Sequence, residues 1–259
     1  MPSAAMKTGP VVARALQILG AFTSDRRSLT LSDLSRHSGL PVSTVHRLVA
    51  ELLAWGALER DHAGCYHIGL RLWEIGSLAP RGLGLREAAL PYLEDLSQVT
   101  RENVQLAVRE GTEVVFVERI AGSGAVPVLT RVGGRFALTA TGVGLVLLAY
   151  SPADVQEQVL ARPIERYTER TLTTAHQIRA VLADTRARGY AVSDRQVTID
   201  ALSVAAPIHD HDGEVVAAVS LVVRHGTAST QALANLICTS ARAISRAISR
   251  AIPPFTPGH

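Results

Sequence analysis

Polar side chains that can form hydrogen bonds cluster in the short segment of residues 42–47. They are Ser43, Thr44, His46 and Arg47, and Val42 lies beside them. In a helix, the two hydroxyl groups would lie at the N-terminal turn, where the helix dipole favours a phosphate. The guanidinium of Arg47 can pair with two acceptors of a guanine, which is worth roughly 1–3 kcal/mol of discrimination between bases. Val42 could contact a thymine methyl group or pack internally. The simpler alternative is that Ser43 and Thr44 only cap a helix and that Arg47 is a solvated charge.

The elements that would position these side chains are two short helices around a tight turn, in LSDLSRHSGLPVSTVHRLVAEL of residues 31–52. Apolar residues recur there at three- and four-residue steps, which is the period of a helix. Gly39 stands where the first helix must stop, a position that often needs a positive φ. Pro41 opens the second helix, where a missing N–H has no consequence. This layout predicts a helix-turn-helix whose second helix enters the major groove of DNA.

A predicted hairpin follows directly. Residues 58–60 and 65–68 flank the turn Asp-His-Ala-Gly of residues 61–64, and glycine at such a turn is typical of a hairpin. A hairpin after a recognition helix is the wing of a winged helix domain. Arg60 and His67 would reach phosphate from this wing, and Arg36 could contact the DNA backbone from the first helix. The alternatives are ordinary exposed side chains in the wing and, for Arg36, a partner of the helix dipole.

The composition limits the other function classes. A hydrophobic content of 47% is ample for packed cores and argues against disorder. Residues 1–80 hold eight Lys or Arg against six Asp or Glu, so basicity alone does not establish nucleic-acid binding. Cys65 and Cys238 are far apart, which is typical of free thiols in a reducing compartment. Without a signal peptide or a membrane-spanning run, we expect a cytoplasmic protein with no membrane partner.

The rest of the chain indicates an α+β organisation. A helix over residues 11–22 would bury Val12, Ala15, Leu16, Leu19 and Phe22, and helical segments near residues 69–79 and 85–100 are interrupted by Pro80, Gly82 and Gly84. Further strands are predicted at 104–109, 113–120, 126–132, 190–193, 201–209 and 214–224, and further helices at 141–150, 152–161, 174–188 and 230–251. Strands in adjacent pairs predict a mainly antiparallel sheet. We therefore expect a winged helix-turn-helix domain at residues 8–70, a helical linker at 71–84 and a second domain at 85–252.

Enzyme chemistry has weak support. The run His-Asp-His-Asp-Gly of residues 209–213 suggests a metal site, but His209 and His211 share one side only if a strand continues through both. Asp212-Gly213 is instead a hairpin-turn signal between two apolar strands. No Ser lies in a GxSxG turn, and Gly142 and Gly144 lack the third glycine of a dinucleotide loop. We expect no catalytic residues, no metal and no cofactor.

The chain resembles the IclR family of bacterial transcription regulators over roughly residues 10–251. The resemblance lies in VVARALQIL, GLPVSTVHRL, YHIGLRLWEIG, GGRFALTATGVGLVLLA and the GYAV…SVAAPI…DGEVVAAVS block. It implies a winged helix domain that dimerises, a linker helix and a GAF-like C-terminal domain that senses a small molecule on the concave face of its sheet. It also implies homodimers or homotetramers.

The effector positions that the resemblance implies are Leu138, Ser193, Ala201, Ser203, Ser220 and Val222. Arg135 follows a pair of glycines and could pair with a carboxylate effector; a surface role is the alternative, and sheet packing is the alternative for the others. The chain departs from the family pattern at Thr139, where a histidine is common, at Leu145, where a lysine is usual, and at Asp200, where a glycine is common.

Together these features predict a regulator that binds a palindromic operator in double-stranded DNA as a dimer. A small-molecule effector, an organic or aromatic acid by the resemblance, would shift operator affinity, with coupling through the linker. Two alternatives stay open. One is a constitutive DNA binder whose second domain serves only oligomerisation, and the other is a metal-dependent small-molecule enzyme fused to a winged helix.

Overall fold

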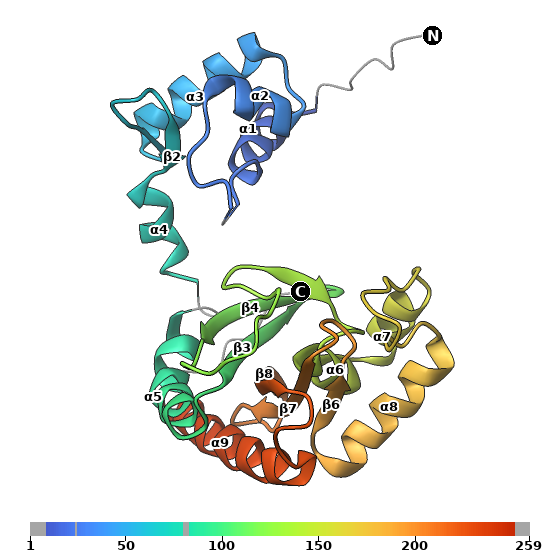
Figure 1. The fold of residues 1–259 in the computed structure, drawn as a ribbon. Coiled ribbons are helices and arrows are strands. Elements are labelled where there is room, and N and C mark those ends of the chain that lie inside the picture. Colours follow the sequence, from blue (N-terminus) through green and yellow to red (C-terminus); the bar gives the residue numbers. More distant parts are fainter. Residues whose placement is uncertain (1–8, 24, 80–82, 252–259) are drawn as a thin grey trace. The chain divides into compact units, whose positions relative to one another are not determined.

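The chain forms two compact units that divide after Ala79 in the computed structural model, which describes residues 9–23, 25–79 and 83–251 (Figure 1). Pro80 and Gly82 of the predicted hinge lie outside the described residues, as do the predicted domain ends at residues 8 and 252. Gly84 lies within a helix rather than in an interruption.

The first unit is a helix-turn-helix followed by a two-stranded wing, as predicted. Its elements are α1 (Val11–Gly20), α2 (Leu31–Ser38), α3 (Val42–Trp55), β1 (Leu58–Arg60), β2 (Tyr66–Ile68) and α4 (Leu70–Gly76). A capping box between Thr30 and Asp33 starts α2, and Gly39 ends it at φ 70°, a conformation that glycine adopts without strain. The two strands of the wing pair antiparallel. Ile18, Leu34, Val45 and Leu58 form the fully buried centre of this unit.

The predicted apolar face of α1 is only partly correct. Ala15, Leu19 and Phe22 are half-buried, but Val12 and Leu16 are 70% and 60% exposed. The buried centre of the helix is Ile18, at 0% exposure. Because a helix turns by about 100° per residue, Leu16 and Ile18 lie on nearly opposite sides, so packing around Ile18 leaves Leu16 outside.

The second unit is built on a six-stranded antiparallel sheet with the order β5-β4-β3-β8-β7-β6. The strands are β3 (Asn103–Glu110), β4 (Glu113–Ile120), β5 (Arg135–Ala137), β6 (Ala191–Asp194), β7 (Ala201–His209) and β8 (Val215–Arg224). The helices are α5 (Leu83–Thr100), α6 (Gly142–Ala149), α7 (Ala153–Leu160), α8 (Ala175–Arg188) and α9 (Thr230–Ala251). The predicted α+β class and most of the predicted elements are therefore confirmed.

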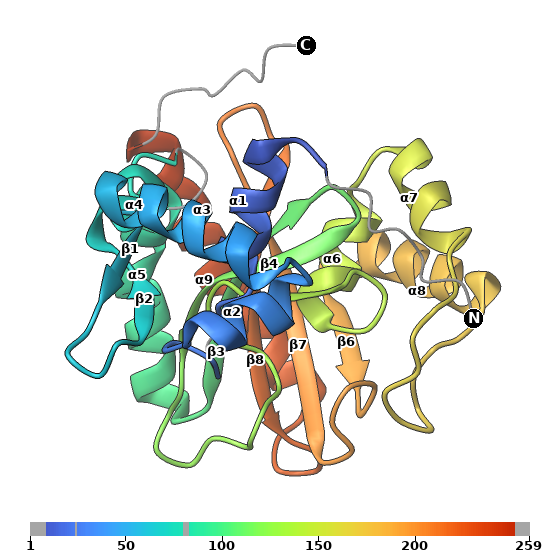
Figure 2. The same ribbon diagram turned by 90° about the horizontal axis from the view of Figure 1, so that it is seen from above.

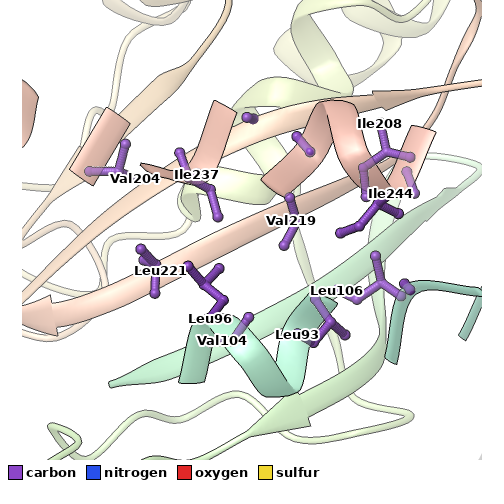
Figure 3. Packing of buried hydrophobic residues seen from close by; sticks show 14 of the residues in the cluster. Leu93, Leu96, Val104, Leu106, Val204, Ile208, Val219, Leu221, Ile237 and Ile244 are labelled. Atoms are coloured by element: carbon purple, nitrogen blue, oxygen red, sulfur yellow. The ribbon is translucent and has the colours of Figure 1, made fainter. Parts of the chain in front are cut away.

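Successive strand residues point to opposite faces of the sheet, and the two faces have different cover. Helices α5 and α9 lie side by side over one face (Figures 1 and 2). Figure 3 shows how Leu93 and Leu96 of α5 and Ile237 and Ile244 of α9 meet strand residues such as Leu106 and Val219. This face is filled by large aliphatic side chains and holds the main core.

The opposite face receives α6 at very close range. All eight residues of α6 are buried. Strands β3, β7 and β8 present the small side chains of Ala107, Ala205 and Ala218 to the same cluster, and β4 adds Val114 and Phe116. A Cβ added at Gly142 would lie 2.7 Å from the hydroxyl oxygen of Ser203. The two glycines that could have suggested a nucleotide loop thus serve packing. Gly142 lets the helix backbone approach the sheet, and Gly144 leaves room for the carbonyl of Leu138 and the hydroxyl of Thr141.

The predicted strand at residues 126–132 is wrong. This segment is an extended loop without strand pairing, and β5 takes the position beside β4 instead. We call residues 121–134 the strap. Side chains of β3 hold its middle, since Asn103 Nδ2 donates to the carbonyl of Val126 at 2.7 Å and Gln105 Nε2 donates to the hydroxyl of Thr130 at 2.5 Å. At its end, the backbone of Gly133 and Gly134 bonds to that of Phe116 in β4.

Within the described parts of the chain, no helix combines the length and apolar character that crossing a membrane requires.

We expect Gly144→Ala to lower the stability of the second unit, because the added Cβ would lie 2.6 Å from the carbonyl oxygen of Leu138. Overpacking of this kind costs about 1–3 kcal/mol, which thermal or urea unfolding of the full chain measures. Gly124→Ala is the matched control, since its Cβ would meet only the carbonyl oxygen of Arg101 at 3.8 Å. Equal stability of the two variants would contradict the packing assigned to α6.

Candidate functional site

The exposed side of α3 carries polar groups that the protein itself does not use. Ser43, His46 and Arg47 are exposed, and their side chains make no hydrogen bond or ion pair with any described residue. Thr44 is half-buried, so it faces away from the core less fully than predicted. Val42 is 51% exposed. Val45, Leu48 and Val49 on the opposite side anchor the helix in the core.

No side chain caps the start of α3. Its N-cap residue is Pro41, in an extended conformation, and no side-chain hydrogen bond closes the first turn. The alternative in which Ser43 and Thr44 act as caps therefore does not hold. The positive end of the helix dipole and the two hydroxyl groups occupy the same end of the helix, an arrangement that suits a phosphate.

The remaining predicted DNA contacts are already engaged within the first unit. Arg36 forms an ion pair with Asp33, the residue that also completes the cap of α2. Arg60 donates from Nε to the carbonyl of Gly64 at 3.2 Å, and its guanidinium lies over the Tyr66 ring at 5.5 Å. Arg60 thus stabilises the wing hairpin, and Arg36 stabilises the start of α2.

His67 is likewise bound inside the wing. Its Nε2 lies 2.7 Å from a carboxylate oxygen of Asp61. The hydrogen bond from His67, together with one from the Cys65 backbone, holds the pKa of the Asp61 carboxyl below its usual value. The sequence alone does not reveal the pairing of His67 with Asp61, because it depends on the hairpin register, which brings residues six positions apart together.

The second unit contains a cavity of about 40 Å³ on the sheet face that α6 only partly covers. Strands β3, β6, β7 and β8 form its floor, the strap covers it, and the N-terminal end of α6 and the segment 196–198 close its sides. Its polar lining is uncharged and consists of Gln105, Thr130, Thr141, Ser193, Gln196, Thr198 and Ser203. Its apolar lining consists of Val128, Leu129, Val197, Ala201 and Val222.

The structure brings four of the seven predicted effector residues together and separates three. Ser193, Ala201, Ser203 and Val222 line the cavity. Ser220 is fully buried on β8, and its hydroxyl donates to Gln105 Oε1 at 3.4 Å, so it supports the floor rather than facing the cavity.

Leu138 and Arg135 belong to a different place. They line a second cavity of about 550 Å³ beside β5, at the edge of the sheet. Arg135 is paired there with Glu113 at 3.0 Å across the β4–β5 ladder. The Gly-Gly turn delivers Arg135 to an edge strand, which carries its side chain away from the uncharged cavity.

Local hydrogen bonds fix the geometry of the uncharged cavity. The hydroxyl of Ser193 donates to the carbonyl of Ala140 at 2.7 Å, which ties β6 to the start of α6. Thr141 caps α6 by accepting from the amide of Gly144 at 3.0 Å. Gln105 joins the strap to the floor through Thr130 and Ser220.

Eight of the twelve lining residues were not predicted as effector contacts, among them Gln105, Thr130 and Gln196. Gln105 could have been recognised in the sequence, because it is the one polar residue in the run Val-Gln-Leu-Ala-Val. The structure buries this strand on both faces. No sequence pattern marks Thr130 or Gln196, because only the folded strap and the β6–β7 connection bring them to the cavity.

Charged groups lie beside the cavity but do not line it. Asp194 is bound by Arg195 at 3.2 Å and by His225 at 2.8 Å. Burial acts to raise the pKa of Asp194, but the hydrogen bonds and charges of Arg195 and His225 outweigh it and hold the pKa below its usual value. This cluster therefore keeps its charges paired among themselves.

The His-Asp-His-Asp-Gly run forms an exposed hairpin turn. Strand β7 ends at His209, whose ring packs against Tyr150, so His209 and His211 do not share a strand face. Asp210, His211 and Asp212 do lie with their ligand atoms within 4.8 Å of one another. The carboxylate of Asp210 accepts from the amides of Asp212 and Glu214 at 3.0 and 2.9 Å, which gives it a role in the turn itself.

Comparison with known proteins matches both units to one family. A family model described as "Bacterial transcriptional regulator IclR C-terminal" matches residues 79–250, and one described as "IclR helix-turn-helix domain" matches residues 11–62. The HTH-type transcriptional regulator XynR of Escherichia coli is 31% identical over 92% of this chain and 96% of its own. BhcR of Paracoccus denitrificans is 33% identical over 90% and 85%.

The solved structures agree. An IclR homologue from Microbacterium hydrocarbonoxydans, complexed with 4-hydroxybenzoate, superimposes with a TM-score of 0.88 at 37% identity and covers 93% of this chain and 100% of that one.

We expect Gln105→Met to loosen the strap, because it removes the hydrogen bonds that join Thr130 and Ser220 through this side chain. Leaving buried polar groups unpaired costs about 1–3 kcal/mol, so amide hydrogen exchange within residues 121–134 should accelerate roughly tenfold or more. Gln98→Met, at an exposed position of α5, is the control. Unchanged exchange in the strap would contradict the role given to Gln105.

Proposed function

The chain belongs to the IclR family of bacterial transcription regulators, and from this premise we propose how its two units divide the work. The first unit would bind a palindromic operator as part of a dimer. The second would bind a small organic acid, and the occupancy of its cavity would change operator affinity. The observation that carries the first part is the unpartnered polar side of α3, which is followed directly by a wing.

We rank the predicted DNA-contacting residues by the hydrogen bonds and ion pairs that each side chain would lose on binding DNA. Ser43, His46 and Arg47 have no partner among the described residues to lose, so a contact to a base or a phosphate would cost only their hydration. Arg36, Arg60 and His67 would first have to leave Asp33, Gly64 and Asp61. We therefore assign base reading to α3, with Val42 and Thr44 at its start, and only backbone contacts to the other three.

A dimer is supported by exposed apolar side chains of the first unit. Val11, Val12 and Leu16 of α1 are exposed, and so are Leu70 and Trp73 of α4. Several large apolar side chains exposed on so small a unit favour a protein partner. A second copy of the chain would also supply the second half-site contact that a palindrome requires. The state could be a homodimer or a homotetramer of a cytoplasmic regulator.

For the effector, we propose that a carboxylate lies at the N-terminal end of α6. The helix dipole favours an anion there, and the hydroxyl groups of Thr141 and Ser203 line the same cavity. The 4-hydroxybenzoate bound by the homologue from Microbacterium hydrocarbonoxydans supports an aromatic acid. Arg135 and Leu138 have no part in this assignment.

The size of the cavity suggests how binding becomes a signal. A volume of about 40 Å³ holds only one or a few waters, whereas ligand sites usually enclose some 300–1,000 Å³. An effector would therefore have to displace the strap. We propose that this displacement, passed on through α4 and α5, changes operator affinity, typically by a factor of about 5–150 for such coupling.

The alternatives predict different behaviour. A constitutive DNA binder would show operator affinity that no organic acid changes. A metal-dependent enzyme would require turnover that depends on the exposed turn at residues 210–212, whose Asp210 serves hairpin geometry.

We expect Arg47→Ala to lower affinity for the operator roughly 5- to 150-fold and to relax the preference at one base position. The operator is first identified by selection from random duplex DNA, and binding is measured by fluorescence anisotropy at fixed salt. Arg36→Ala is the control, and its smaller loss should be equal for all sequences. If Arg47→Ala keeps the base preference of the wild type at every operator position, Arg47 does not read a base.

We expect Ser203→Val to abolish the effect of 4-hydroxybenzoate on operator affinity while operator binding itself persists, because the larger side chain fills the floor of the uncharged cavity. Arg135→Gln, in the larger cavity at the sheet edge, should respond as the wild type does. The reverse outcome, with only Arg135→Gln unresponsive, would move the effector site to that edge.

A further inference from the structure

Gln196 is a buried side chain whose hydrogen-bonding capacity is unused. It is 7% exposed, it lines the uncharged cavity, and its Oε1 is buried without a hydrogen-bond partner in the described structure. Buried polar side-chain atoms nearly always have partners, because leaving one unpaired is unfavourable. An open acceptor in a residue that lines a ligand cavity therefore points to a donor on a ligand that reaches it when the strap moves.

The backbone around Gln196 is held in place, so the side chain cannot satisfy itself by a local shift of the chain. The hydroxyl of Thr171 donates to the Gln196 carbonyl at 2.6 Å, and the hydroxyl of Thr168 donates to the Arg195 carbonyl at 2.6 Å. Arg195 itself has a φ of 56°, in the left-handed region that strains a residue with a side chain. Strained residues that neighbours hold in this way are typical of ligand clamps.

Several other polar groups of the cavity differ from Gln196 because the protein already uses them. Ser193 donates to Ala140, Thr141 accepts from Gly144, and Gln105 bonds both Thr130 and Ser220. Gln196 alone among the residues that line the described cavity has a buried side-chain atom left open. This makes it the position at which a ligand's chemistry can be selected.

We propose that Gln196 accepts a hydrogen bond from a hydroxyl group of the effector, so that the cavity selects hydroxylated organic acids over the unsubstituted acids. The inference rests on the proposed effector function, in which the carboxylate lies near Thr141 and Ser203. The unpaired atom is the amide oxygen, which cannot pair with a carboxylate oxygen because both are acceptors, so this atom serves the other polar end of the ligand. An acid without a hydroxyl leaves this acceptor buried and unpaired, which sites of this kind discriminate against strongly.

The test measures the affinities of the full-length protein for benzoate, 3-hydroxybenzoate and 4-hydroxybenzoate by isothermal titration calorimetry. In the wild type, the better of the two hydroxy acids should bind at least about tenfold more tightly than benzoate. In Gln196→Met, this ratio should fall to near one through weaker binding of the hydroxy acid, with benzoate binding unchanged or improved. Gln98→Met should keep the wild-type ratio.

The outcomes separate the two proposals. If all three acids bind the wild type equally, or if the ratio survives in Gln196→Met, the role of Gln196 is overturned while an acid effector stands. If no acid binds, the proposed acid effector falls, and the Gln196 assignment falls with it. Because Gln196→Met removes no hydrogen bond of the side chain, its unfolding midpoint should not decrease, and Gln196→Leu provides a second variant.

Discussion

The close approach of α6 to the sheet is the constraint on which the second unit depends. Gly142 lacks the side chain that would hold the helix away from β7, Gly144 leaves room for the Leu138 carbonyl, and alanines on three neighbouring strands keep the facing side chains small. A helix pressed so tightly against one part of the face leaves the adjoining part uncovered by any helix. There the strap provides the cover, and there the cavity forms.

Alternate residues of the same strands thus place aliphatic side chains on one face of the sheet and polar side chains on the other. Leu106, Val219 and Val204 point to the side of α5 and α9, where dense aliphatic packing holds the unit together. Gln105, Ser220 and Ser203 point to the other side, where hydroxyl and amide groups bond the strap or line the cavity. The proposed ligand site thus lies apart from the aliphatic packing of α5 and α9, so the proposed movement of the strap would leave that packing intact.

In the first unit, the same separation lies within a single helix. Val45, Leu48 and Val49 fix α3 in the core, and this leaves Ser43, His46 and Arg47 with no internal partner. The neighbouring cations of α2 and of the wing are bound to groups of their own elements. Selectivity for DNA would therefore depend on a few side chains of α3 and on pairing of two copies, which agrees with the small excess of positive charge in residues 1–80.

By itself the sequence determined the features that depend on neighbours along the chain. The helix period, the turn glycine at Gly39, the wing hairpin and the pairs β3–β4 and β7–β8 could all be predicted, because short-range geometry and burial of one face specify them. Tertiary structure decided which segments find distant partners. The alternating residues 126–132 became a strap because Asn103 and Gln105 bind it and β5 occupies the edge of β4. Arg135 moved to the sheet edge, and Gln196 came to line the cavity with an unpaired oxygen. An unpaired buried atom is a property of everything packed around it, so no pattern along the chain could have shown it.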